Sequence, residues 1–201
     1  MAFPALHPSL TILLVGALYL AAFSGLALLR RQRTSPRFAV EVGVLTALGV
    51  ALPLLSVHLG PILFLVVLYL LTMRVRLVVD VGNFLTSRGR FRQALAVFRL
   101  ALRLGPDSAS RQIVAINRGV TQLRMKEPEA AYFTLKTVLI DEQARPGLRY
   151  LAAGYYNLGV ACLRIGRRQE ASRSFRSAIE SLPGSLFAHA AEQALKREGL
   201  D

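Results

Sequence analysis

Residues 152–185 read AAGYYNLGVACLRIGRRQEASRSFRSAIESLPGS, and residues 75–108 read VRLVVDVGNFLTSRGRFRQALAVFRLALRLGPDS. Small, aromatic and proline residues fall at the same offsets in the two stretches, and in both of them 24 positions separate the first aligned glycine from the proline. The aligned residues are Gly82, Leu85, Gly89, Ala94, Phe98, Ala101 and Pro106 in one stretch, and Gly159, Cys162, Gly166, Ala171, Phe175, Ala178 and Pro183 in the other. Such an internal period predicts helical units that stack on their neighbours.

A weaker copy of the pattern lies between these two stretches, in residues 112–140, which read QIVAINRGVTQLRMKEPEAAYFTLKTVLI. The residues that fall at the expected offsets are Gly119, Ala131, Leu135 and Val138. Lys126 stands where the other copies have a turn glycine, and Pro128 stands at the position of Phe91 in the first copy. The sequence therefore predicts three consecutive helical pairs, of which the middle one departs most from the pattern.

These copies resemble the tetratricopeptide repeat family, whose pattern W-x2-L-G-x2-Y…A-x3-F…P lies on a helix–turn–helix of about 34 residues. The resemblance implies an all-α fold, with a right-handed tetratricopeptide-type α-solenoid in residues 74–201. It places repeats at about 75–108, 112–142 and 152–185, followed by a C-terminal capping helix at 186–198 whose residues Leu186, Ala190 and Leu195 face inward. The extra residues between copies are expected in 109–111 and 141–147. A generic helical bundle is the alternative.

The first third of the chain differs in composition. Only five of the 37 charged residues precede position 74, namely Arg30, Arg31, Arg33, Arg37 and Glu41. Apolar runs at about 9–29, 38–57 and 59–73 predict three N-terminal transmembrane helices in a membrane domain of residues 1–73. Because the third run is shorter than a full span, the hairpin of the second and third runs could instead enter the membrane without crossing it.

The basic residues beside these runs predict an orientation. Four arginines lie between the first and second runs, whereas the turn at 58–60 carries no Lys or Arg. Because Lys and Arg collect in cytoplasmic loops, we expect the N-terminus outside and residues 74–201 in the cytoplasm. The first run precedes its positive charges, an order that fits an uncleaved anchor better than a signal peptide. The sequence therefore predicts a multi-pass protein of the cell inner membrane.

Two further expectations concern the apolar helices. Small residues recur every four positions, as Ala17, Ala21 and Gly25 in the first run and as Gly43, Ala47 and Ala51 in the second. Such faces let helices approach closely, so we expect packing within the chain or self-association of copies through the membrane helices. No Gly or Pro lies between Pro61 and Gly82, so we also expect one unbroken helix over 61–88.

The resemblance also implies where a protein or peptide partner binds, because tetratricopeptide arrays hold peptides or helices on the concave face made by the first helix of each repeat. The residues placed there are Arg76, Val79, Asn83, Thr86, Ile113, Ile116, Asn117, Val120, Arg124, Tyr156, Val160 and Arg164. Their apolar middle and basic flanks favour an amphipathic or hydrophobic segment with some acidic character. Val79, Ile116 and Val120 could equally belong to the core.

The charge of the second part favours anionic partners. The formal net charge is +13, and residues 74–201 contribute +10 of it. Arg92, Arg99 and Arg103 are spaced to share one face of a helix, which we expect either to contact anionic membrane lipid or to be solvated. Nucleic acid is not an expected partner, because aromatic residues do not alternate with the basic ones.

The sequence lacks the common patterns of catalytic and cofactor sites. Neither G-x-x-x-x-G-K-[ST] nor G-x-G-x-x-G nor H-E-x-x-H occurs. The single cysteine, Cys162, lies at a helix-packing offset, which indicates a buried thiol rather than a nucleophile. We therefore predict a non-catalytic, membrane-anchored adaptor or scaffold, without cofactor or metal, that recruits a protein at the cytoplasmic membrane face. The alternative is a structural subunit of a larger membrane complex, in which the spans make the main contacts.

Overall fold

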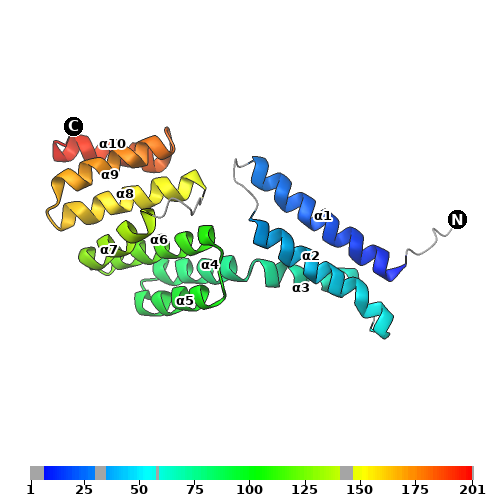
Figure 1. The fold of residues 1–201 in the computed structure, drawn as a ribbon. Coiled ribbons are helices and arrows are strands. Elements are labelled where there is room, and N and C mark those ends of the chain that lie inside the picture. Colours follow the sequence, from blue (N-terminus) through cyan, green and yellow to red (C-terminus); the bar gives the residue numbers. More distant parts are fainter. Residues whose placement is uncertain (1–6, 30–34, 58, 141–146, 201) are drawn as a thin grey trace. The chain divides into compact units, whose positions relative to one another are not determined.

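The computed structural model describes residues 7–29, 35–57, 59–140 and 147–200. All regular secondary structure within these residues is helical (Figure 1). The chain divides into two compact units, Met1–Arg74 and Val75–Asp201. Arg30, Arg31 and Arg33, on which the predicted orientation depends, lie outside the described residues, and so do residues 141–146.

The first unit is an up-and-down bundle of α1 (Pro8–Leu29), α2 (Pro36–Ala51) and α3 (Pro61–Thr72), with the short 3-10 helix η1 (Leu52–Leu55) after α2. Two glycines allow its helices to approach. A Cβ on Gly16 would collide with the side chain of Thr46 in α2, and a Cβ on Gly49 would collide with the ring of Phe64 in α3. The apolar residues buried around these crossings are Ile12, Tyr19, Val42, Phe64 and Leu68.

The small residues predicted to make these contacts do not make them within the chain. Ala17, Ala21 and the second-run residues Gly43, Ala47 and Ala51 are exposed. A Cβ on Gly25 or Gly43 would meet no atom within 4 Å. A shift of one residue turns a helix by about 100°, so the face through Gly16 is distinct from the face through Ala17. The contact between α1 and α2 therefore uses a different face of each helix from the predicted one, and self-association through the small-residue faces stays a prediction.

Polar contacts join the ends of the bundle. The hydroxyl oxygens of Tyr19 and Thr72 lie 2.7 Å apart, which connects α1 to α3. The Arg74 guanidinium donates hydrogen bonds of 2.8 and 2.9 Å to the two carboxylate oxygens of Glu41, and Arg37 donates a third bond of 3.1 Å. The first turns of α2 and Arg74, two residues after the end of α3, are therefore held together by a bidentate ion pair.

The prediction of three full spans is wrong. Among the described residues α1 is the one helix long and apolar enough to cross a membrane, and its 22 residues extend about 33 Å. Helix α2 stops at Ala51 because Pro53, in η1, has no N–H to continue it. Helix α3 has 12 residues, or about 18 Å, against a hydrocarbon core of about 30 Å. A second span would require α3 and α4 (Arg74–Ser87) to be counted as one broken helix.

The expectation of an unbroken helix over 61–88 is also wrong. The chain leaves the helical conformation at Met73, where φ is −96° and ψ is 6°, and α4 begins at Arg74. Side chains also bond backbone carbonyls at this break. The Thr72 hydroxyl donates to the carbonyl of Leu68 at 2.7 Å, and Arg74 donates to that of Leu71 at 2.5 Å. Such bonds compete with the helical ladder, so the helix ends without Gly or Pro.

The second unit contains three antiparallel helix pairs stacked in sequence order. The pairs are α4 with α5 (Phe91–Arg103), α6 (Ser108–Arg124) with α7 (Pro128–Leu139), and α8 (Leu148–Arg164) with α9 (Arg168–Ser181). A further helix, α10 (Leu186–Glu198), packs against α8 and α9 at the end of the stack (Figure 1). Ser185 accepts a hydrogen bond from the Ala188 N–H and thereby caps α10. Leu195 is buried as expected, but Leu186 is 79% exposed rather than facing inward.

The same contact recurs inside each pair. A glycine on the first helix faces a large apolar side chain on the second, as Gly82 faces Phe98, Gly119 faces Leu135 and Gly159 faces Phe175. A Cβ on Gly119 or Gly159 would lie 2.6 Å from an atom of the opposite side chain, which is closer than atoms can approach. Phe98, Leu135 and Phe175 are fully buried. Each pair is thus held by a side chain that occupies the space a Cβ would need.

We expect Gly159→Ala to destabilise the second unit by about 1–3 kcal/mol, because the new methyl group must displace the buried ring of Phe175. Thermal unfolding of the full chain in detergent, followed by circular dichroism, measures this loss. Gly43→Ala is the matched control, because its Cβ meets no atom within 4 Å. Equal shifts of the midpoint for the two variants would contradict the packing described.

Candidate protein-interaction surface

The structure divides the predicted partner-binding residues by exposure. Arg76, Asn83, Arg124 and Arg164 are exposed, whereas Ile113, Asn117, Val120, Tyr156 and Val160 are half-buried. Val79, Thr86 and Ile116 are buried. These last three residues pack between helices, so a partner cannot touch them without opening the unit.

The buried members hold the repeats together. Val79 lies in a cluster with Ala94, Phe98 and Val114 and so joins α4 to α5 and α6. The hydroxyl oxygens of Thr86 and Thr121 lie 2.9 Å apart, in contact between the first helices of two consecutive repeats. The first helices α4 and α6 are therefore packed side by side.

Several polar side chains of the first helices are engaged within the fold. The Asn117 amide donates to the carbonyl of Ile113 at 2.8 Å, one turn earlier in its own helix. Arg164 donates to the carbonyl of Leu123 at 2.8 Å, which links α8 to the end of α6. Of the residues that remain, Ile113 packs against the cluster of Val79, Phe98 and Val114, and Arg124 lines the pocket described next. The other five, which we call the first-helix surface, are Arg76, Asn83, Val120, Tyr156 and Val160. It combines a basic and an amide group on α4 with an apolar part on α6 and α8.

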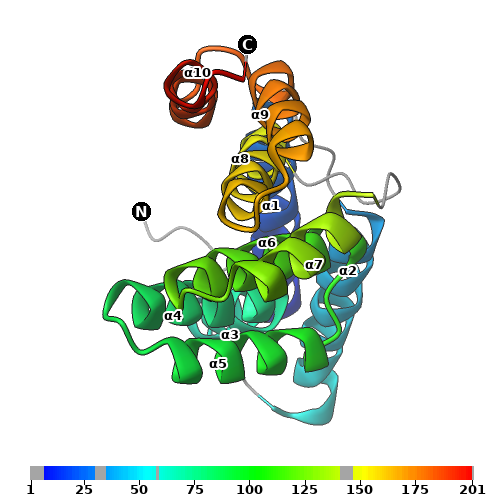
Figure 2. The same cartoon turned by 90° about the vertical axis from the view of Figure 1, so that its left-hand side faces the viewer.

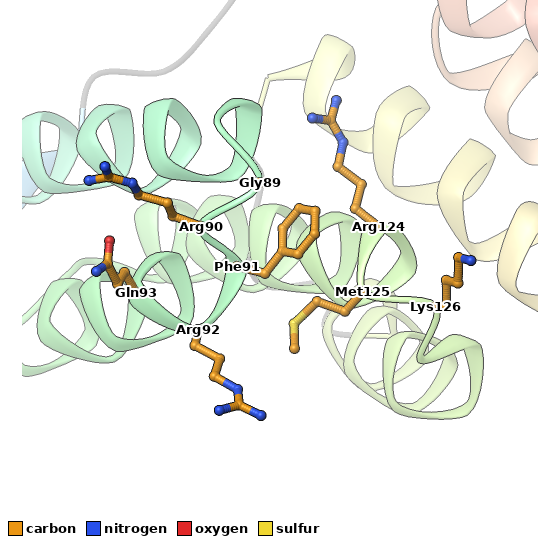
Figure 3. A pocket seen from close by; sticks show the side chains of 8 residues that line it. All are labelled: Gly89, Arg90, Phe91, Arg92, Gln93, Arg124, Met125 and Lys126. Atoms are coloured by element: carbon orange, nitrogen blue, oxygen red, sulfur yellow. The ribbon is translucent and has the colours of Figure 1, made fainter.

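Arg92 and Arg124, which the sequence places on two different surfaces, line one hollow (Figure 3). This hollow, which we call the turn pocket, measures about 570 Å³ and is open to solvent. It lies between the turn that joins α4 to α5 and the turn that joins α6 to α7. The residues that line it are Gly89, Arg90, Phe91, Arg92, Gln93, Arg124, Met125 and Lys126. In the sequence, this pocket could have been predicted from the basic strings RGRFR (88–92) and RMK (124–126).

A charged cluster joins the second helices of the last two repeats. Glu170 on α9 accepts hydrogen bonds from Tyr132 at 2.9 Å, from Arg167 at 2.9 Å and from Lys136 at 3.1 Å. Arg167 also lies 4.6 Å from the centre of the Tyr132 ring. These donors, with Tyr132 first, lower the pKa of the Glu170 carboxyl to about 2. Each charged group of the cluster has a partner within the fold, which indicates a structural role.

The single cysteine has no features of a nucleophile. Cys162 is fully buried on α8 and is not in a disulfide. Burial raises the pKa of its thiol to about 11, so the thiolate is scarce at neutral pH. Among the described residues, no group of three or more His, Cys, Asp or Glu side chains could hold a metal ion.

Comparison with known proteins adds one finding. Residues 152–183, which contain most of α8 and all of α9, match the sequence model of the tetratricopeptide repeat. No curated protein matches the chain.

The Glu170 cluster predicts a pH dependence. Because the folded-state pKa of Glu170 lies below its ordinary value of 4.5, its contribution to stability is present above about pH 4.5 and is lost as the pH falls toward 2. The gap in unfolding free energy between the native chain and Glu170→Gln should therefore narrow over that window. Since the Glu170 side chain is 37% exposed, salt should narrow it too.

Chemical denaturation at several pH values measures this gap. Glu129→Gln is the control, because the exposed Glu129 makes no ion pair with the described residues. A gap that stays constant from pH 5 to about pH 2 would contradict the assigned role of Glu170.

Proposed function

This chain is a tetratricopeptide-repeat protein, and from that premise we propose that it is a membrane-attached adaptor whose repeats bind a protein partner. The combination of a matched interaction repeat in the second unit with outward-facing apolar side chains on the first unit carries this proposal. Repeats of this type bind polypeptides on the surface of their first helices. The membrane unit would keep that surface near the bilayer.

The exposed apolar surface of the first unit supports membrane attachment. Only Phe64 and Leu68 are buried among the 12 residues of α3, while Ile62 is 80% exposed. On α1, Leu18 is 69% exposed, and leucines at positions 10, 13, 14, 26, 28 and 29 are exposed as well. Soluble proteins rarely present contiguous apolar surface on this scale. In a bilayer, lipid tails would surround these side chains and remove their apolar surface from water, which is favourable.

The packing of α1 favours an uncleaved anchor over a removed signal sequence, although both kinds of segment are long and apolar. Ile12, Gly16 and Tyr19 form the face of α1 that contacts α2 and α3. Removal of α1 would expose Val42 and Phe64 and leave the hydroxyl of Thr72 without Tyr19. The first unit therefore depends on α1 for its core.

The proposed topology has α1 as the span and α2 with α3 as a hairpin that enters and leaves on the cytoplasmic side. Arg37 and Arg74, at opposite ends of this hairpin, meet at Glu41. Basic residues on both sides of the hairpin thus lie at one end of the unit, as cytoplasmic positions require. In this proposed topology the N-terminus lies outside, and the repeats, as a right-handed solenoid, lie in the cytoplasm of a cell with an inner membrane.

For the partner, the first-helix surface favours an amphipathic segment. Val120 and Val160 offer apolar contact on α6 and α8, and Arg76 and Asn83 offer a cation and an amide on α4. A segment with one apolar face and acidic residues at its edge would complement both parts.

Charged substitutions on α1 test the membrane attachment. We expect Leu14→Arg with Leu18→Arg to increase the fraction of the chain released by alkaline washing, because each arginine at the centre of a span costs about 3 kcal/mol. Leu100→Arg with Leu186→Arg is the control, since both leucines are exposed in the second unit. Equal release of the two variants would contradict the role of α1.

Photo-crosslinking in the native membrane tests the partner surface. A photoreactive amino acid at Asn83, Val120 or Val160 should give the same discrete adduct, because these positions lie on the first-helix surface. Exposed positions on second helices, Phe133 and Arg173, are the controls and should not give it. An adduct formed from Leu18 and from none of the first-helix positions would instead support the structural-subunit alternative.

A further inference from the structure

The turns within the three repeats are all basic. They read RGRFR at 88–92, RMK at 124–126 and RIGRR at 164–168. Figure 1 shows the three turns at the same end of their helix pairs, and Figure 2 views the second unit from that end. The stacking of repeats thus gathers cations from three separate parts of the sequence along one edge.

The cations of the third turn are already engaged, whereas those of the turn pocket are not. Arg167 pairs with Glu170, Arg164 bonds the Leu123 carbonyl, and Arg168 bonds the carbonyl of Glu198. The pocket residues Arg90, Arg92, Arg124 and Lys126 make no side-chain hydrogen bond or ion pair with any described residue. Glu127 and Glu129, the acidic residues closest to the pocket in sequence, form no ion pair with these cations. The pocket therefore concentrates positive charge that nothing in the described fold neutralises.

The arrangement around the pocket is a ring. In Figure 3 the four cationic side chains extend in different directions, and Phe91 and Met125 occupy the centre between them. Both of these apolar side chains are half-buried and remain reachable from solvent. A ligand that fits must carry an apolar group for the centre and negative charges on more than one side of it.

One residue of the ring is held in an unfavourable backbone conformation. Lys126 has φ of +63°, at the turn position where the other two repeats have Gly89 with φ of +73° and Gly166 with φ of +79°. Only glycine adopts this conformation without steric cost. A lysine at this position weakens the turn and places a cation at the pocket, which points to a use for that cation.

We propose that the turn pocket binds an acidic segment of a polypeptide, with an apolar side chain of that segment on Phe91 and Met125 and its carboxylates on the surrounding cations. A bilayer surface presents its charges in a plane, which does not match cations that diverge around a hollow. Single-stranded nucleic acid requires a row of stacking aromatic rings, and the pocket has one. The turn pocket shares no residue with the first-helix surface, so this site stands or falls independently of the adaptor function.

Fluorescence anisotropy with the full chain in detergent micelles tests this site. The probe is a fluorescein-labelled peptide of repeated Asp-Glu-Leu triplets, and the comparison peptide has Asn-Gln-Leu triplets. We expect Arg90→Glu with Lys126→Glu to weaken binding of the acidic peptide by about tenfold or more, since attraction becomes repulsion at the pocket. Arg173→Glu with Arg176→Glu makes the same change of net charge at exposed positions of α9 and should weaken it by less than about twofold.

A second variant distinguishes loss of binding from loss of folding. Lys126→Gly relieves the positive φ and should keep the thermal midpoint at or above the native value, while it weakens peptide binding by about threefold through loss of one cation. Unchanged binding by Lys126→Gly would overturn the assignment of this residue to the site.

Other outcomes would overturn the proposal as a whole. Equal loss of binding in the pocket variant and the α9 variant would show attraction by net charge alone. Equal binding of the Asn-Gln-Leu peptide would exclude recognition of carboxylates. Displacement of the acidic peptide by phosphatidylserine added to the micelles or by polyuridylate, at concentrations where phosphatidylcholine added to the micelles displaces nothing, would assign the pocket to lipid or nucleic acid.

Discussion

The second unit depends on close approach of the two helices in each repeat, and a missing Cβ makes that approach possible. Gly82, Gly119 and Gly159 each receive the end of a buried side chain from the opposite helix. Because the same contact recurs three times, the pairs have similar geometry and can stack in register, with α10 covering the last pair. The stacking aligns the first helices on one surface and the intra-repeat turns along one edge. Both candidate binding surfaces follow from it.

The helices of the first unit pack in a different way. Its helices touch through narrow stripes centred on Gly16 and Gly49, and a bidentate ion pair between Glu41 and Arg74 fastens the hairpin at one end. Most of its large apolar side chains point away from these stripes. In water such an apolar surface would cause the protein to associate, whereas a helix that faces the hydrocarbon of a bilayer needs an apolar surface. The proposed membrane attachment explains why a small bundle keeps so much apolar surface outside its core.

The sequence predicted the helices of the repeats because their signal is local: glycine, alanine and phenylalanine recur at fixed offsets, and Phe98 and Phe175 are buried as that pattern requires. The breaks between the helices of the first unit were harder to predict. The side chains of Thr72 and Arg74 donate hydrogen bonds to backbone carbonyls at the end of α3. A hydropathy profile cannot predict these bonds, because it does not describe hydrogen bonding by side chains. The turn pocket was missed for another reason. Arg92 and Arg124 come together only through the stacking of repeats, which neither turn specifies by itself.

Proteolysis of sealed inner-membrane vesicles tests the central claim, that a membrane unit displays the repeats on the cytoplasmic face. In inverted vesicles, where the cytoplasmic face is outward, added protease should digest the second unit and leave a membrane-bound fragment that contains α1. In right-side-out vesicles the second unit should be protected. Protection of the second unit in inverted vesicles, or recovery of the intact chain in the soluble fraction, would contradict the proposed arrangement.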